Sequence, residues 1–257
     1  MIFRTDLALE RREVYKKAQA IEDEIEGIEC NEEKPNERIQ ITRVKILNEK
    51  GEEALSKPIG EYITLDISKV KYMEEEATEE ASNILAEEIK KLVDKHIGKE
   101  EPVLIVGLGN EYVTPDSLGP KVANDIEVTR HIIKYCPQFV KEGTREISAI
   151  SPGVLGVTGI ETLEIVKGIV ENVKPKLLIV IDSLCSKNIE RISSSVQLSD
   201  TGIVPRSRSR KYKSRTFWKN SWNSSNCFRS SNGCRSCYNY KWWFRFIYTK
   251  ITRWSKV

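Results

Sequence analysis

The sequence predicts an α/β fold built on a mostly parallel sheet with helices on both faces. Two short, fully apolar runs are the first evidence: residues 103–106 end at Gly107, and residues 176–181 end at Asp182. Between them, Thr158-Gly-Ile-Glu161 is a capping box that predicts the start of a helix. Fully apolar strands separated by helices are typical of parallel sheets that are covered on both faces.

The remaining elements are predicted from the spacing of apolar residues. Residues 7–28 are charged, with apolar positions at roughly helical spacing, and an acidic link that contains proline follows over residues 31–37. Residues 39–46 and 62–67 alternate apolar and polar side chains, which indicates half-buried strands. Residues 74–96 predict a long helix, because acidic residues crowd its first turns and lysines its last.

Charge is unevenly distributed along the 257 residues. The chain has 41 Lys+Arg against 38 Asp+Glu, a net charge of +3, yet residues 206–257 contain 14 Lys+Arg and no acid. Residues 1–205 therefore carry 27 basic and 38 acidic groups, a balance of −11. The last 52 residues also hold all five tryptophans and neither Leu nor Ala. Because one fold would rarely divide its composition in this way, we expect a boundary near residue 205.

Composition excludes several classes of protein. No apolar run reaches the roughly 18 residues that a membrane-spanning helix needs. The N-terminus lacks the apolar region of a signal peptide, and six cysteines in 257 residues are too sparse for a secreted disulfide scaffold. We therefore expect a cytoplasmic protein without a membrane partner, with one domain over residues 7–205.

Two carboxylates lie at the ends of the predicted apolar strands. Ligands of a doubly wound sheet bind beyond the carboxyl ends of its strands. Gly107-Leu-Gly-Asn110 and then Asp116 follow the first strand, and Asp182 ends the second. Two nearby carboxylates cannot easily both ionise, so one can keep a proton while the other activates water. The alternatives are that Asp116 caps a helix that begins near Gly119 and that Asp182 is a turn residue.

The same glycines invite a dinucleotide-binding interpretation, which the sequence does not favour. Tyr112 stands where that fingerprint requires its third glycine. Gly107 and Gly109 are better explained by a tight turn or a close approach of the backbone.

A nucleophilic triad is also disfavoured. Cys185 follows the second strand, but only His96 and His131 are available as its base. His96 ends a helix, where its charge complements the helix dipole, and His131 lies in an apolar-periodic stretch. Ser183 has no elbow motif around it.

Five segments, in order and at sensible spacing, resemble the germination protease family of endospore-forming bacteria. They are Arg4-Thr-Asp-Leu-Ala8, Gly107-Leu-Gly-Asn110, Thr114-Pro-Asp-Ser-Leu-Gly-Pro120, Ser151-Pro-Gly-Val-Leu-Gly-Val-Thr-Gly-Ile-Glu161 and Ile181-Asp-Ser-Leu-Cys-Ser186. The resemblance implies a three-layer α/β/α sandwich similar to that of hydrogenase-maturation peptidases. It also implies an endopeptidase without a cofactor that initiates degradation of small acid-soluble spore proteins during germination, in the cytoplasm of the forespore and the spore core.

The resemblance also assigns individual residues. It places the family's two proposed catalytic aspartates at Asp116 and Asp182, the pair already selected from the strand ends. Gly107, Gly109 and Asn110 would shape the substrate-side turn, where backbone N–H groups could face the developing oxyanion.

Family members are made as zymogens that cleave themselves and assemble as homotetramers. Thr5-Asp-Leu-Ala8 resembles the family's substrate cleavage motif, which implies processing of the Asp6–Leu7 bond and makes residues 1–6 a propeptide remnant. The alternative is that Thr5 or Asp6 caps the helix that follows.

The resemblance stops after Pro205. Gly233 to Trp243 can be encoded so that an offset of one nucleotide reads Val-Val-Asp-Leu-Ala-Thr-Ile-Ile-Asn-Gly, and extension upstream through Arg229 adds Gly-Val-Pro-Thr, similar to the family's ending. Our hypothesis is that residues 206–257 are an out-of-frame basic tail. The chain would then lack an apolar strand and a helix of the family, and its sheet would have an exposed edge.

Other interpretations of this tail and of the acids remain open. Cations interleaved with aromatic residues resemble a nucleic-acid-binding arm, and Cys227, Cys234 and Cys237 hint at a metal site, although no fourth Cys or His lies nearby. Neither is favoured, so we expect no metal and no nucleic-acid partner. The rival functions are a metal-dependent peptidase in which Asp116 and Asp182 are ligands, and a non-catalytic binding protein.

Overall fold

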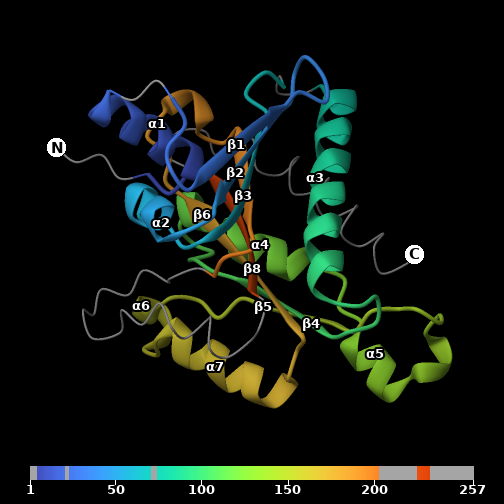
Figure 1. The fold of residues 1–257 in the computed structure, drawn as a ribbon. Helices are drawn as coiled ribbons and strands as arrows, with labels where there is room; N and C mark the ends of the chain where they lie inside the picture. Colours follow the sequence, from blue (N-terminus) through green and yellow to red (C-terminus); the bar gives the residue numbers. More distant parts are fainter. Residues whose placement is uncertain (1–4, 21–22, 71–73, 203–224, 232–257) are drawn as a thin grey trace.

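A mixed eight-stranded sheet forms the centre of the molecule in a computed structural model that describes residues 5–20, 23–70, 74–202 and 225–231 (Figure 1). The strand order is β1-β2-β3-β7-β8-β6-β4-β5. The strands are β1 (Ile28–Glu33), β2 (Gln40–Ile46), β3 (Gly60–Asp66), β4 (Val103–Gly107), β5 (Ile147–Ile150), β6 (Leu177–Leu184), β7 (Ser195–Ser199) and β8 (Ser225–Ser231). The helices are α1 (Ala8–Gln19), α2 (Glu49–Leu55), α3 (Glu75–His96), α4 (Leu118–Asp125), α5 (Arg130–Tyr135), α6 (Leu155–Thr158) and α7 (Thr162–Val173), with short 3-10 helices η1 (Thr114–Asp116), η2 (Pro137–Phe139) and η3 (Ile189–Arg191).

Helices cover both faces of this sheet, which confirms the predicted three-layer α/β/α sandwich. Leu85 and Ile89 of α3 and Val122 of α4 pack against one face, in a cluster with apolar side chains of β4 and β6. Val166 and Val170 of α7 pack against the opposite face of the same strands. Helices α1 and α2 contribute to a further cluster over β2 and β3, on the side away from α3 (Figure 1).

Strand direction corrects the expectation of a mostly parallel sheet. The pairs β4–β5, β4–β6 and β6–β8 are parallel, whereas β1–β2, β2–β3, β3–β7 and β7–β8 are antiparallel. The fully apolar sequences of β4 and of residues 177–181 of β6 reveal the parallel half, because both faces of the sheet are buried there. The antiparallel half includes β1, whose exposed and mostly polar residues were predicted in part as a link.

Strand β8 corrects the expectation of an exposed sheet edge. Its backbone pairs parallel with β6, placing residue 229 opposite Asp182, and antiparallel with β7. The tail therefore contributes a strand to the middle of the sheet. The rest of the predicted tail, residues 206–224 and 232–257, lies outside the described residues.

The helix predictions succeed where the apolar stripe is long. The 22-residue helix α3 has acids in its first turn, Lys95 and His96 in its last, and its expected stripe buried. Helix α1 is shorter than predicted. The predicted capping box is wrong, because Thr158 ends α6 and α7 begins at Thr162 without a side-chain cap. Among the described helices, none is long and apolar enough to cross a membrane.

A buried ion pair joins α3 to the antiparallel half of the sheet. The side chain of Glu88 is 3% exposed and accepts hydrogen bonds from Arg43 of β2 at 2.7 Å and from Lys91 at 2.8 Å. Burial alone would raise the pKa of Glu88. The hydrogen bonds and positive charges of the two cations outweigh burial and lower this pKa below its ordinary 4.5.

Glu88→Gln is expected to lower the free energy of unfolding at pH 7 by about 3 kcal/mol, because Arg43 then lacks a buried counter-charge. A carboxylate with a lowered pKa stabilises the fold above its unfolded pKa, and this contribution is lost as pH falls through the folded pKa. The difference between the two proteins should therefore shrink below pH 4.5. Urea denaturation over a pH series measures it, with the exposed neighbour in Glu87→Gln as control. A difference independent of pH would contradict the ion-pair account.

Candidate active site

Asp116 closes the turn that follows β4. It ends η1, and its carboxylate accepts a hydrogen bond from the backbone N–H of Asn110 at 2.9 Å. The carbonyl oxygen of Asp116 accepts from the same N–H at 3.1 Å. The helix-cap alternative is wrong, because α4 begins at Leu118 with Ser117 at its N-cap and no side-chain cap. Asp116 therefore fixes the loop rather than the helix.

The glycines of this turn are required by close packing, as predicted. Gly109 has φ +123°, and a Cβ there would lie 2.0 Å from the carbonyl oxygen of Asp116. A Cβ on Gly107 would lie 2.0 Å from the carbonyl oxygen of Gly119. The N–H of Asn110 is already donated to Asp116, which contradicts its expected availability for an oxyanion.

Asp182 lies within β6 rather than after it. The strand continues to Leu184, so the turn-residue alternative is wrong. The side chain is half-buried, and its Oδ1 accepts the backbone N–H of Ser183 at 2.8 Å. Gly107, the last residue of β4, pairs in parallel register with Ile181. Asp182 is thus one residue beyond the level at which β4 ends.

A close backbone crossing brings the segments of the two aspartates together. Gly119, three residues after Asp116, lies so near β6 that a Cβ there would be 2.5 Å from the carbonyl oxygen of Ile181. The N–H of Leu108 donates to the same carbonyl oxygen at 2.8 Å, and η1 contacts β6. Asp116 and Asp182 therefore both lie at the carboxyl ends of adjacent parallel strands.

The predicted processing bond is buried against the loop that follows β6. Asp6 is 8% exposed, and Leu7 is 0% exposed. The N–H of Asp6 donates to the carbonyl oxygen of Cys185 at 2.9 Å, and the Asp6 carboxylate accepts the N–H of Cys185 at 3.2 Å. The alternative that Thr5 or Asp6 caps α1 is wrong, since Leu7 is the N-cap residue and the helix starts at Ala8 without a side-chain cap. The carboxylate of Asp6 binds this loop instead.

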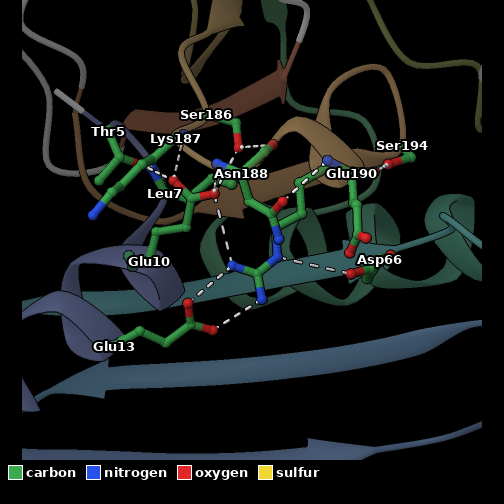
Figure 2. A network of polar contacts seen from close by, with 12 residues as sticks. Thr5, Leu7, Glu10, Glu13, Asp66, Ser186, Lys187, Asn188, Glu190 and Ser194 are labelled. Atoms are coloured by element: carbon green, nitrogen blue, oxygen red, sulfur yellow. Dashed lines mark hydrogen bonds and ion pairs between the residues drawn. The ribbon is translucent and has the colours of Figure 1, made fainter. Parts of the chain in front are cut away.

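Sequence reasoning missed Glu10, a buried carboxylate in the first turn of α1 (Figure 2). It is 3% exposed and accepts hydrogen bonds from the Ser186 hydroxyl at 2.6 Å and from the backbone N–H groups of Lys187 at 2.8 Å and Asn188 at 3.1 Å. The Thr5 hydroxyl also donates to it. Burial would raise the pKa of Glu10, but these hydrogen bonds outweigh burial and lower it. No local sequence pattern predicts this contact, because Glu10 and Ser186 are 176 positions apart in the chain.

The segments that build this site match a known family. The sequence model of the family described as germination protease matches residues 5–217. The chain belongs to the germination protease family. A germination protease of Caldanaerobacter subterraneus subsp. tengcongensis is 50% identical over 202 residues, which are 79% of this chain and 60% of that relative. The germination protease of Clostridium acetobutylicum is 47% identical over 203 residues, 79% of this chain and 61% of that relative.

The chain is also similar to a germination protease of Bacillus mycoides and, weakly, to the solved structure of a hydrogenase maturation protease. The Bacillus mycoides relative is 42% identical over 203 residues, 79% of this chain and 55% of that relative. The chain thus spans about three fifths of the length of the curated germination proteases that it matches. A hydrogenase maturation protease of Thermococcus kodakarensis matches 64% of this chain and 94% of its own, with 16% identity and a TM-score of 0.36.

The tail cysteines only hint at a metal site, which the sequence does not favour, and most of them lie outside the described residues. Cys227 lies in β8, whereas Cys234 and Cys237 lie outside the described residues. Among the described residues, no group of three or more His, Cys, Asp or Glu is placed to hold a metal ion.

Proposed function

We propose that this chain derives from an endopeptidase that initiates degradation of small acid-soluble spore proteins during germination, with Asp116 and Asp182 as its catalytic pair. One observation carries the proposal: within the part that matches the family, both carboxylates lie at the carboxyl ends of adjacent parallel strands. This is the edge of an α/β sheet at which ligands bind. The spore core and its forespore precursor would be the compartment.

The proposed mechanism needs one ionised and one protonated carboxyl group. The ionised aspartate accepts a proton from water as the water oxygen attacks the carbonyl carbon of the peptide bond. The protonated aspartate supplies a proton to the leaving nitrogen, and the C–N bond breaks to give a carboxylate and an amine. Backbone N–H groups bonded to Asp116 and to Asp182 orient both side chains for these transfers.

The zymogen proposal rests on the chain's own substrate-like motif. Asp6, Leu7 and Ala8 repeat the acidic–apolar–alanine order expected of the substrate, and all three are buried. In this arrangement, an external protease has poor access to the Asp6–Leu7 bond. We propose that residues 1–6 are a propeptide remnant removed by self-cleavage, and that the intact protein assembles as a homotetramer.

The proposal about residues 206–257 can be tested by comparing self-cleavage in two versions of the chain. We propose that residues 206–257 are out of frame and that a frame-restored chain regains self-cleavage at Asp6–Leu7, at a rate at least about 100-fold above that of the present chain. Intact-mass spectrometry after incubation measures both rates. An Asp116→Asn version of the restored chain is the matched control for contaminating proteases. Equal cleavage of the restored and present chains would refute the tail hypothesis.

Chelation separates this proposal from the metal-dependent alternative. The restored chain should retain its rate after exhaustive dialysis against a chelator. Loss of activity on chelation and its return with a divalent cation would instead support the metal-dependent alternative.

A further inference from the structure

The Thr5 hydroxyl joins the backbone at the predicted processing bond to Glu10. Its oxygen accepts a hydrogen bond from the N–H of Leu7 at 3.2 Å and donates its own hydrogen to the Glu10 carboxylate. The Thr5 hydroxyl therefore bridges the Leu7 nitrogen and the Glu10 carboxylate. Figure 2 shows Thr5 and Leu7 beside Glu10, under the loop that bears Ser186.

Hydrogen bonds that do not involve residues 1–6 hold the backbone at Leu7 and Ala8 in place. The carbonyl oxygen of Leu7 accepts the N–H of Arg11 at 3.1 Å. The next N–H, that of Ala8, donates at 2.8 Å to the side-chain oxygen of Gln197, which is 1% exposed in β7. Removal of the preceding residues therefore leaves the Leu7 nitrogen beside the position that the Thr5 hydroxyl vacates next to Glu10.

Glu10 is likewise held in place without residues 1–6. Its carboxylate keeps the hydrogen bonds from Ser186, Lys187 and Asn188, and Arg191 lies 3.7 Å away. Arg191 is shared with Glu13, at 2.9 Å, and with Asp66, at 3.9 Å. Loss of Thr5 would leave one acceptor position of a buried carboxylate empty.

We propose that Glu10 is the binding site for the new α-ammonium group of Leu7, which replaces the Thr5 hydroxyl once the Asp6–Leu7 bond is cut. This inference rests on the proposed processing. Hydrolysis adds one water across the C–N bond, so Asp6 gains an α-carboxylate and Leu7 becomes an α-ammonium at neutral pH. A cation at the N-terminus of α1 opposes the helix dipole, and the carboxylate of Glu10 offsets that repulsion.

The exchange would alter the loop after Asp182 in a defined way. Cleavage ends the two hydrogen bonds that Asp6 makes with Cys185. It preserves the hydrogen bonds of Glu10 to Ser186, Lys187 and Asn188. Glu10 is thus a positioning residue. It holds residues 186–188 of this loop in place while Cys185 loses its hydrogen bonds to Asp6.

The test uses the chain that begins at Leu7, produced by removing an N-terminal fusion with an unrelated protease. The pKa of the Leu7 α-ammonium, followed by NMR, is expected to lie above the value of about 8 typical of an α-amino group. Glu10→Gln should increase its acid dissociation constant about tenfold. Glu13→Gln is the matched control, because Glu13 shares Arg191 but has no hydrogen bond to Thr5 or Leu7. An unchanged constant in Glu10→Gln, or equal changes in both variants, would overturn the proposal.

A second measurement keeps Glu10 intact, in case Glu10→Gln does not fold. Nα-acetylation of the chain that begins at Leu7 removes the positive charge and adds an acetyl group, and it should lower the thermal midpoint of that chain. Equal midpoints with and without the acetyl group would contradict the ion pair. Neither measurement depends on self-cleavage, so a frame-restored chain that never processes itself would refute the proposed function without changing these outcomes.

Discussion

Asp116→Asn and Asp182→Asn are each expected to slow peptide-bond cleavage about 1,000-fold in the frame-restored chain. Asparagine preserves the size and can still accept a backbone hydrogen bond, but it can neither take a proton from water nor donate one as a carboxylic acid. Loss of one proton-transfer group typically costs a factor of 100 to 10,000. Hydrolysis of a small acid-soluble spore protein, with self-cleavage as a second readout, measures the effect.

The control for these substitutions lies on the helix that follows η1. Asp125 is the exposed last residue of α4, so Asp125→Asn changes the same charge without touching the site. It should cleave at the unchanged rate. One result would contradict a catalytic role for Asp116 or for Asp182. It is an Asn variant of that residue that cleaves at the unchanged rate and has the thermal midpoint of the unmodified chain.

Gly119→Ala is expected to destabilise the chain by about 3 kcal/mol, because the added methyl group overlaps backbone atoms that cannot rotate away. Its Cβ would lie 2.2 Å from the carbonyl oxygen of Leu108 and 2.5 Å from that of Ile181. The end of β4, the start of α4 and β6 would have to separate. Because this crossing also aligns the segments of Asp116 and Asp182, the activity of any folded fraction should fall as well.

Urea denaturation of Gly119→Ala measures the loss of stability. Gly168 in the middle of α7 is the matched control, since a Cβ there has no heavy atom within 4 Å. Gly168→Ala should stabilise the chain by about 0.5–1 kcal/mol, because alanine is the better helix former. Equal changes in the free energy of unfolding for the two substitutions would show that the backbone around Gly119 is packed less tightly than the structure indicates.

The sequence predicts the elements whose burial is uniform or strictly periodic. Strand β4 and the first five residues of β6, 177–181, are apolar throughout because they are covered on both faces, and α3 shows an unbroken apolar stripe. Strand β7 escapes prediction because it buries polar side chains: Gln197 and Ser195 are each 1% exposed. Strand β1 escapes for the opposite reason, since an edge strand exposes polar residues on both faces.

The candidate site is predictable only in part, for a related reason. Strand ends and glycines are local signals, and they select Asp116, Asp182 and the turn at Gly107. The direction of each side chain is not local. The hydrogen bond between Asn110 and Asp116 depends on the exact geometry of the turn. The contacts of Glu10 with residues 186–188 depend on how distant segments meet in the fold.

The measurement that tests the central claim most directly is the cleavage rate of the double variant Asp116→Asn/Asp182→Asn in the frame-restored chain. If the ionised and the protonated aspartate act as a unit in one cleavage reaction, losing the second after the first costs little. We predict a rate within about threefold of the slower single variant. Two losses that multiply, so that the double variant is about 1,000-fold slower than either single variant, would contradict the account.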